Sequence, residues 1–363
     1  MNILILNWRD IRHEWAGGSE VYVFELAKRW VKMGHNVDLF CGQNIGGNLP
    51  AEEKIDGINI HRKGGRYSLY FWAFWYYLTK FRKKCDVVVD IQNGIPFFSV
   101  LYSRKPKVAI SYHVHRMQWF FEFPFPLNFV GYFFERFLFP LLYRNTQIIA
   151  ISNTTKAELI KIGFKKENIH IVYAGVVGNN VSSEKFFQPT ILYLGRIKKY
   201  KRVEMLVRIM PSILKHVPDA RLVIAGWGTE AAHIADVSMK SVIRKKIKIL
   251  GPVSESEKKH FLSKSWVFVN PSIGEGWGIA VLEANLYGTP AVAFNVNGLS
   301  ESIQHGKTGF LAENEEDFID KICTILKDAK LREEMNNNSE KWAEKFNWDD
   351  ASKISLKIID QQR

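Results

Sequence analysis

The feature that most constrains this chain is a glycine-rich stretch that leads into a helix. It reads Gly-Glu-Gly-Trp-Gly-Ile-Ala-Val-Leu-Glu over residues 274–283, and it lies between two short apolar segments, 266–270 and 291–294, that we expect to be strands. Gly288 and Pro290 end the expected helix before the second strand. A glycine loop that enters a helix exposes backbone N–H groups at the positive end of the helix dipole, which favours phosphate binding. The pattern therefore predicts an α/β unit with an anion site at its turn.

The two glutamates of this stretch occupy different places in the expected unit. Glu275 lies in the glycine loop, and Glu283 lies about one and a half turns into the helix, since a turn takes about 3.6 residues. One interpretation is structural: Glu275 caps the helix and Glu283 faces solvent. The flanking glycines favour a binding site instead, because glycines lower stability unless something must approach the backbone closely. The two carboxylates are therefore candidate ligands for hydroxyl groups, with phosphates held by the backbone between them.

The length and the cysteine usage bound the class of protein. A chain of 363 residues with 47% hydrophobic and 24% charged residues is expected to form two globular domains. Cys41, Cys85 and Cys323 lack metal-ligand spacing and favour a reducing compartment, and the chain begins with an apolar strand rather than a basic leader. We therefore expect a cytoplasmic protein, and the longest uncharged runs are too short to span a bilayer.

The net charge of +13 is unevenly distributed. Residues 1–180 hold 23 Lys/Arg and 14 Asp/Glu, which gives +9, so the rest of the chain carries +4. The first half is therefore the more basic one and the half that we more expect to bind an anionic partner. Such a partner could be nucleic acid, lipid headgroups or a pyrophosphate-linked acceptor. No nucleic-acid-binding signature is found, so we expect no nucleic acid.

A second glycine turn follows the first strand. Residues 1–8 are expected to form a buried parallel strand, and Gly17 and Gly18 directly precede an amphipathic helix that ends near Gly34. The pair can be a plain turn, but its place at a helix start after a first strand favours a ligand. The fingerprint Gly-x-Gly-x-x-Gly is absent here, so the turn does not have the pattern of a dinucleotide site.

Two histidines follow another expected strand of the first half. The strand covers 107–112, and His113 and His115 come directly after it. Ligands of open α/β sheets bind at the carboxyl ends of strands, so this place favours a functional over a structural role for a histidine. The position alone leaves both histidines as candidates.

The first half also holds two aromatic runs. The first covers 67–77 and is followed by Lys80, Arg82, Lys83 and Lys84, and the second covers 117–126 and continues through 129–142. Two interpretations stay open at equal weight. The aromatic residues form core helices over the sheet, or they form an interfacial surface that dips among lipid headgroups beside basic residues.

The second half opens with a strand over 190–194 and a basic loop. Gly195 and Arg196 come at the end of this strand, and Lys201 follows within a run of basic residues. A basic loop is usually a solvated face, but this one lies at the carboxyl end of a strand, the same kind of place as the Glu275 loop. A later strand, expected over 247–253, ends at Val253.

Together these motifs resemble glycosyltransferase family 4 (group 1), a family of retaining enzymes of GT-B fold that use nucleotide sugars. The match rests on Pro271-Ser272, Glu275-Gly276-Trp277-Gly278, Glu283-Ala284 and Gly288-Thr289-Pro290, and it extends over nearly the whole chain. It implies an α/β fold with two Rossmann-like domains that face each other across a cleft. The expected divisions are a first domain over 1–178, a linker over 179–189, a second domain over 190–346, and a C-terminal helix over 347–363 that returns to the first domain.

The resemblance also implies roles for particular residues. Glu275 and His113 would orient the donor sugar, Arg196 and Lys201 would neutralise the diphosphate, and Glu283 would hold the ribose. The other implied donor-binding positions are Gly17, Gly18, Gly195, Val253, Gly276, Trp277, Gly278 and Ile279. No Asp-x-Asp pair is present, so we expect no metal, and the resemblance implies no cofactor beyond a UDP- or GDP-linked sugar as co-substrate.

One departure and two alternatives accompany this interpretation. The family usually has Asn-Gly-Val-Asp after the last strand of the first domain, whereas this chain has Ala-Gly-Val-Val over 174–177, which lacks both polar groups. The expected activity is sugar transfer to a glycan or a polyprenyl-linked saccharide. Peripheral contact of the protein with the inner face of a membrane is left open. A nucleotide-sugar 2-epimerase and a non-catalytic sugar-nucleotide binding protein are the alternatives.

Overall fold

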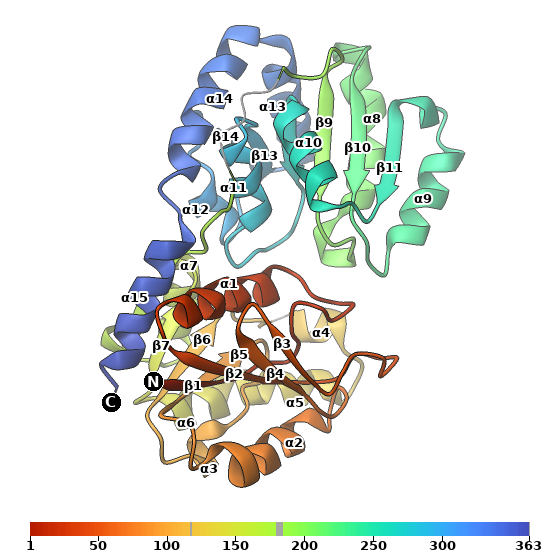
Figure 1. The fold of residues 1–363 in the computed structure, drawn as a ribbon. Helices are drawn as coiled ribbons and strands as arrows, with labels where there is room; N and C mark the ends of the chain where they lie inside the picture. Colours follow the sequence, from red (N-terminus) through yellow and green to blue (C-terminus); the bar gives the residue numbers. More distant parts are fainter. Residues whose placement is uncertain (117, 179–183, 363) are drawn as a thin grey trace. The chain divides into compact units, whose positions relative to one another are not determined.

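The computed structural model describes residues 1–116, 118–178 and 184–362 (Figure 1). The chain divides into two compact units. The first comprises Met1–Ala174 together with Trp348–Arg363, and the second comprises Gly175–Asn347.

The first unit is built on one mainly parallel sheet. Its strands follow the order β3-β4-β2-β1-β5-β6-β7-β8, and only the β3–β4 pair is antiparallel among the pairs described. The strands are β1 (Asn2–Leu6), β2 (Asn36–Cys41), β3 (Glu52–Ile55), β4 (Ile58–Arg62), β5 (Val87–Gln92), β6 (Lys107–Ser111), β7 (Gln147–Ala150) and β8 (Ile169–Ile171). The β3–β4 hairpin extends the sheet beyond the strands that the sequence patterns predict.

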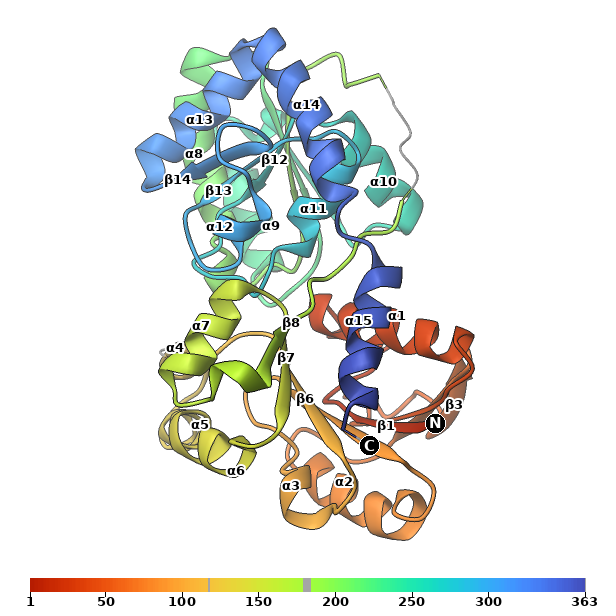
Figure 2. The same cartoon turned by 90° about the vertical axis from the view of Figure 1, so that its left-hand side faces the viewer.

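Helices of the first unit cover both faces of this sheet. They are α1 (Gly18–Lys32), α2 (Leu69–Tyr76), the π-helical η1 (Tyr77–Phe81), α3 (Ser99–Tyr102), α4 (Gln118–Glu122), α5 (Leu127–Phe133), the π-helical η2 (Phe134–Leu138), α6 (Phe139–Tyr143), α7 (Asn153–Lys161), the 3-10 helix η3 (Lys166–Asn168) and α15 (Trp348–Asp360). The last helix packs on α1 (Figure 2). The indole of Trp30 donates to the carbonyl of Ser352 at 3.2 Å, and the rings of Tyr22 and Trp348 lie 5.6 Å apart.

The second unit is a fully parallel sheet of the order β11-β10-β9-β12-β13-β14. Its strands are β9 (Thr190–Leu194), β10 (Arg221–Ala225), β11 (Ile247–Gly251), β12 (Val267–Asn270), β13 (Ala291–Phe294) and β14 (Gly309–Ala312). Its helices are η4 (Lys199–Lys201), α8 (Val203–His216), α9 (Ala231–Lys240), η5 (Arg244–Lys246), α10 (Glu255–Lys264), α11 (Ile279–Leu286), α12 (Leu299–Ser302), α13 (Glu315–Lys327) and α14 (Ala329–Ala343).

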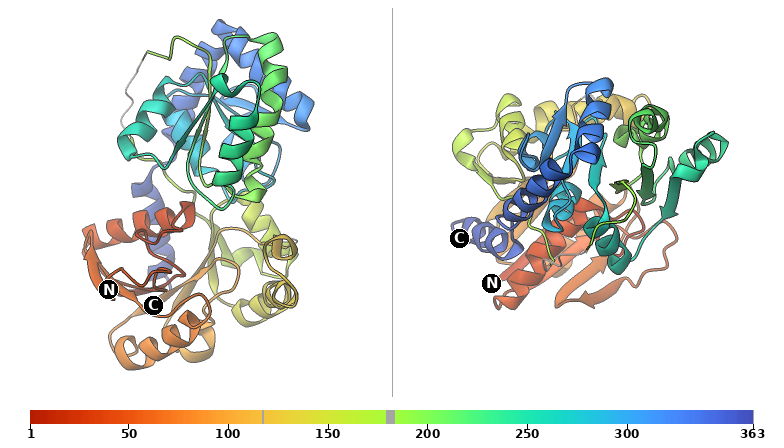
Figure 3. Two further views of the ribbon diagram at one scale, coloured as in Figure 1. Left: turned by 90° about the vertical axis from the view of Figure 1, so that its right-hand side faces the viewer. Right: turned by 90° about the horizontal axis from the view of Figure 1, so that it is seen from above.

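Successive side chains along each strand of the second sheet point to opposite faces, and each face has its own hydrophobic core. Ile191 and Tyr193 of β9 pack with residues of α8 and α13, whereas Leu192 between them packs with residues of α10 and α11. Helices therefore lie on both faces of the sheet (Figure 3), and the strands are buried on both sides, as in doubly wound α/β proteins. The prediction of two Rossmann-like domains with a C-terminal helix that belongs to the first is confirmed.

Candidate active site

The glycine-rich stretch forms the turn between β12 and α11. Gly278 is the N-cap of α11 and has a φ of +90°, a left-handed conformation that an L side chain rarely adopts. A Cβ at Gly298, in the next loop, would lie 2.4 Å from the carbonyl oxygen of Glu275. The two loops are therefore packed backbone against backbone, and glycine is required at both positions for this turn to form.

The carboxylate of Glu275 is surrounded by donors. Lys201 forms an ion pair with Oε1 of Glu275, the Ser272 hydroxyl donates to the same oxygen at 2.9 Å, and the Asn270 amide lies 3.3 Å from it. Burial raises the pKa of Glu275, but Lys201 and the hydrogen bonds outweigh that effect and hold the pKa below its ordinary value. Glu275 is therefore a carboxylate at neutral pH. Capping of α11, the structural interpretation of this residue, is not what its side chain does.

Lys201 reaches Glu275 because β9 and β12 are neighbours in the sheet. Its helix, η4, follows β9, and the Tyr200 carbonyl accepts a hydrogen bond from the N–H of Ile273 at 3.1 Å, which joins the two loops. Burial is the largest single effect and lowers the pKa of Lys201, but the charge of Glu275, its hydrogen bond and Tyr200 together outweigh burial and raise the pKa. The ammonium group is therefore charged.

The loop after β9 is shaped by a second close contact between backbones. A Cβ at Gly226 would lie 1.8 Å from the carbonyl oxygen of Gly195, so the loop after β10 can pack there only with glycine. The Tyr193 hydroxyl donates to the carbonyl of Arg196 at 2.8 Å and fixes the turn. Arg196 is close enough that its charge opposes the charge on Lys201. Arg196 and Lys201 thus form one positive region at the carboxyl edge of β9.

The second glutamate, Glu283, makes an ion pair with Lys258 that no sequence pattern predicts. The Nζ of Lys258, in α10, lies 2.6 Å from Oε1 of Glu283, and both side chains are about one-fifth exposed. Burial is the largest single effect and lowers the pKa of Lys258, but Glu283, together with Glu255 and Tyr287, outweighs burial and raises the pKa. The two helices are adjacent because each packs on the same face of the sheet. Only the contact between α10 and α11 could have revealed this pair.

The remaining positions of the donor side belong to the same edge of the sheet. Trp277 is buried and its ring lies 5.3 Å from that of Phe346, so its side chain serves packing while its backbone borders the turn. Gly276 and Ile279 are half-buried on either side of it. Val253 lies after β11, immediately before Ser254, the N-cap of α10. The structure therefore places the residues predicted for this half in the segments that follow the strands of one sheet, with Ile279 and Glu283 inside α11.

In the first unit, the turn at Gly17 and Gly18 is closed by a buried glutamate. The N–H of Gly17 donates to Oε2 of Glu20 at 2.7 Å, and the Ser19 hydroxyl donates to the same oxygen at 2.9 Å. Arg9, from the loop after β1, lies 3.3 Å from the other oxygen of Glu20. The turn is therefore an α-helix start that its own first-turn carboxylate stabilises.

The two histidines after β6 have different surroundings. Glu135, a buried carboxylate of η2, accepts from the N–H of His115 at 2.7 Å and from the Trp119 indole at 3.1 Å, and its Oε1 lies 3.3 Å from Nδ1 of His115. The His113 ring is half-buried and lies 4.2 Å from the His115 ring. Glu135 and Trp119 thus fix His115, which gives that residue a structural role.

The residue before His113 connects this loop to the glycine turn. The Tyr112 hydroxyl donates to the carbonyl of Ser19 at 2.8 Å. The carboxyl end of β6 and the N-terminus of α1 are therefore held together in the first unit, although they are 93 positions apart. Gly17, Gly18 and His113 belong to one neighbourhood, as the sheet rule predicts.

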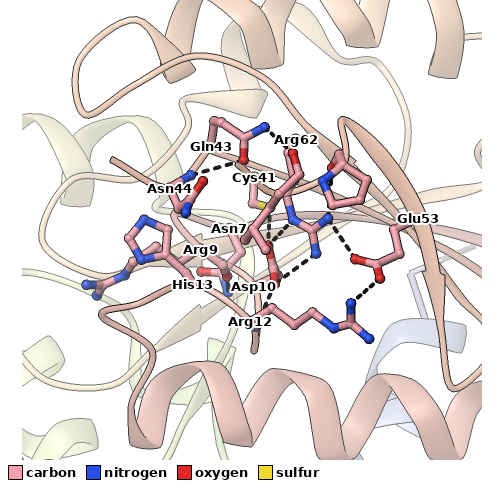
Figure 4. Close-up of polar contacts among 12 residues, drawn as sticks. Asn7, Arg9, Asp10, Arg12, His13, Cys41, Gln43, Asn44, Glu53 and Arg62 are labelled. Atoms are coloured by element: carbon pink, nitrogen blue, oxygen red, sulfur yellow. Dashed lines mark hydrogen bonds and ion pairs between the residues drawn. The ribbon is translucent and has the colours of Figure 1, made fainter. Parts of the chain in front are cut away.

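A buried ion-pair cluster supports the loop after β1 (Figure 4). Arg62, at the end of β4, binds both oxygens of Asp10, with Nε at 2.6 Å and Nη2 at 3.1 Å, and both side chains are almost fully buried. Arg62 also reaches Glu53 at 2.9 Å, and Glu53 pairs with Arg12. No sequence pattern predicted this cluster, because Asp10 and Arg62 are 52 positions apart and no motif marks either of them.

Within the described ranges, no group of three or more His, Cys, Asp or Glu side chains is arranged to hold a metal ion. No helix among the described residues is long and apolar enough to cross a bilayer.

Comparison with known proteins agrees with this geometry. Residues 16–177 match the model described as Glycosyltransferase Family 4, and residues 180–342 match that of Glycosyl transferases group 1. An uncharacterised glycosyltransferase of Methanocaldococcus jannaschii is 27% identical over 99% of this chain and 97% of its own length. A sucrose-phosphate synthase from Thermosynechococcus elongatus has the same fold, with a TM-score of 0.82, 19% identity and coverage of 99% and 98% of the two chains.

A third similar protein, HepE of Anabaena in complex with UDP-glucose, superposes with a TM-score of 0.76 at 15% identity, over 99% of this chain and 100% of that one. The two sheets and their strand-end loops define the GT-B class of glycosyltransferases. The chain belongs to the group 1, family 4 glycosyltransferases, and it is a transferase.

Proposed function

We propose that this glycosyltransferase moves a sugar from a UDP- or GDP-linked donor to a glycan or lipid-linked saccharide, with retention of configuration and without a metal. The observation that carries the proposal is the convergence of Arg196, Lys201 and the N-terminus of α11 on the loop of Glu275. Fixed positive charge and backbone donors at one point suit a diphosphate.

The proposed reaction breaks the bond between the anomeric carbon and the diphosphate oxygen. The leaving diphosphate keeps the electron pair, and Arg196, Lys201 and the first N–H groups of α11 stabilise its charge. Electrostatic preorganisation of this kind is often the largest catalytic contribution. The acceptor oxygen forms the new bond from the side that the diphosphate leaves, and its proton passes to a diphosphate oxygen. Neither Glu275 nor His113 is assigned as a nucleophile in this scheme.

The other residues of the site are proposed to bind and orient the substrates. Glu275 is ionised and can accept hydrogen bonds from sugar hydroxyls, and Glu283 is proposed to hold the ribose beside Lys258. His113 is proposed to orient the donor sugar, because it follows the carboxyl end of β6, which Tyr112 ties to the turn of Gly17 and Gly18. HepE, a protein of the same fold, is described in complex with UDP-glucose, which supports a nucleotide-sugar donor here.

A panel of UDP- and GDP-linked sugars tests the proposal. Each donor is incubated with the protein, with and without added saccharide acceptors, and the products are followed by NMR. We expect one donor to be hydrolysed slowly alone and transferred faster with an acceptor, and the new glycosidic bond to keep the anomeric configuration of the donor. Conversion of a donor to its 2-epimer without acceptor would identify an epimerase instead, and binding without any turnover would identify a non-catalytic protein.

A further inference from the structure

The helices that cover one face of the first sheet form a single layer. The strand register places Leu4, Val88 and Ala109 on the same face, and these residues belong to the cores under α2 and under α6. The short helix α3 lies between the two. Ring contacts join Phe74 to Tyr102 at 5.4 Å and Phe98 to Phe134 at 5.6 Å. Helices α2, α3, α5 and α6 lie on this side of the sheet in Figures 1 and 2.

The outer surface of this layer is apolar where solvent-facing helices are normally polar. Along the continuous helical segment from α5 to α6, four large residues are spaced by four positions and are more than half exposed: Phe129 (55%), Phe133 (55%), Phe137 (54%) and Leu141 (63%). This spacing places them on one stripe of the helix. The opposite side of the segment buries Phe139 and Tyr143 in the core, so the segment is apolar on both sides.

Helix α2 repeats the pattern. Leu69, Ala73, Tyr77 and Phe81 face the core, whereas the other side of α2 and η1 exposes further large residues. The exposed set comprises Phe71, Phe74, Trp75 and Leu78, together with Tyr67 just before α2 and Leu101 of α3. We call these residues and the α5–α6 stripe the aromatic layer. An exposed apolar surface of this extent marks a site that contacts another surface.

The charges around the aromatic layer select its partner. Residues 67–84, 96–107 and 125–145 contain a single acidic residue, Glu135, which is buried. The same segments carry basic residues, of which Arg82, Lys83, Lys84, Arg104 and Arg144 are exposed. A second copy of this chain would bring the same positive charge against itself, whereas an anionic bilayer surface offers both the opposite charge and an apolar interior.

We propose that the aromatic layer is a membrane-docking surface that binds bilayers containing anionic lipids. The exposed aromatic and aliphatic side chains enter the headgroup region, and the exposed Arg and Lys side chains hold the anionic headgroups. The docking goes beyond the proposed transfer reaction and does not depend on it. The sequence left two interpretations open for the aromatic runs, core helices or a membrane surface. In this proposal the side of the helices that faces the sheet is core, and the opposite side contacts the membrane.

The test is flotation of the whole protein with vesicles of phosphatidylglycerol and phosphatidylcholine, or of phosphatidylcholine alone, at low and high salt. We expect binding to the anionic vesicles at low salt and its loss at high salt, because surface charges are screened. The variant Phe133→Gln/Phe137→Gln/Leu141→Gln should lose binding. The variant Lys83→Glu/Lys84→Glu should lower it by about twentyfold or more, since each basic residue near an anionic surface contributes about fivefold.

Matched controls come from the second unit. Phe187→Gln/Val242→Gln removes two nearly fully exposed apolar residues outside the aromatic layer, and Arg244→Glu/Lys245→Glu reverses two exposed basic charges. Both controls should float like the wild type, and thermal unfolding should show that all variants are folded. No flotation of the wild type, equal flotation with neutral vesicles, or equal loss in the control variants would overturn the proposal. The proposal would also be overturned if the wild type bound no vesicles and instead formed concentration-dependent dimers that the triple variant abolishes. The assay needs no turnover, so its outcome is independent of the proposed reaction.

Discussion

Lys201 and Glu275, which lie 74 positions apart, form an ion pair at the edge where β9 and β12 run side by side. Ser272 and Asn270 donate to the same carboxylate oxygen. The pair couples two groups with different proposed tasks, since Lys201 is assigned to the diphosphate and Glu275 to the sugar. Each charge holds the other in its ionised form, so a change at one residue is expected to appear at the other.

The first prediction uses this coupling. Lys201→Ala should lower turnover about a hundredfold or more, in the range observed when an enzyme loses one donor to a developing anion. It should also raise the pKa of Glu275, so the acidic limb of the pH–turnover profile should move to higher pH. Lys199→Ala is the matched control, because Lys199 is exposed in the same short helix. If the acidic limb of the profile lies at the same pH in Lys201→Ala as in the wild type, the ionisation of Glu275 does not determine that limb.

The second prediction separates the two glutamates. Glu283→Ala should chiefly weaken the binding of the free nucleoside diphosphate, because Glu283 is assigned to the ribose. Glu275→Ala should lower turnover while the free nucleotide still binds. Calorimetric titration of UDP or GDP and steady-state kinetics on the same variants measure the two effects. Equal losses of nucleotide affinity in both variants would contradict the division.

The third prediction concerns metals. Arg196 and Lys201 are proposed to supply the charge that a metal supplies in other transferases. Turnover should therefore be unchanged, within about twofold, after dialysis against EDTA. Complete loss in EDTA, reversed by magnesium or manganese, would replace this assignment with a metal-assisted one.

The fourth prediction tests the buried cluster of the first unit. Burial raises the pKa of Asp10, but Arg62 and neighbouring donors outweigh burial and hold it below the ordinary value of 3.8. The lowered folded-state pKa means that the ionised Asp10 stabilises the fold above pH 3.8, and that this contribution is lost as the pH falls through the folded-state pKa. Asp10→Asn should lower the free energy of unfolding at pH 7 by about 3–5 kcal/mol, because it removes the charge of the almost fully buried partner of Arg62 and leaves only Glu53 to pair with that guanidinium.

The pH dependence distinguishes this effect from simple loss of packing. The difference in unfolding free energy between wild type and Asp10→Asn should narrow as the pH is lowered below 3.8. Asp219→Asn, at an exposed carboxylate of the second unit, is the control and should change stability little. A difference that stays constant from pH 7 to pH 3 would show that the charge of Asp10 is not responsible.

The fold was predictable from the sequence because its signals are local. Apolar strands, glycine turns and amphipathic helices alternate along the chain, and the turn at Gly278 needs a residue that tolerates a positive φ. The β3–β4 hairpin was not predicted. Its strands are short, and β3, with the sequence Glu-Glu-Lys-Ile, lies at the sheet edge and lacks an apolar core pattern.

The positions of Lys201 and Glu275 after neighbouring strands were predictable, because a residue type and a strand end coincide there, whereas the ion pair between them was not predicted. Pairs that depend on packing between distant segments were not predictable. Lys258 reaches Glu283 across two helices, and Arg62 reaches Asp10 across the sheet. Glu135 distinguishes His115 from His113 only through the position of η2. Such partners follow from tertiary contacts that the spacing of residues does not encode.

The most direct test of the central claim is calorimetric titration of UDP and GDP into the wild type, Arg196→Ala, Lys201→Ala and Lys199→Ala. One of the two nucleotides should bind the wild type, and its affinity should fall about tenfold or more in Arg196→Ala and in Lys201→Ala, because each loses a charged donor to the diphosphate. Lys199→Ala should bind as the wild type does. Equal affinity in all four proteins would contradict a diphosphate site at Arg196 and Lys201.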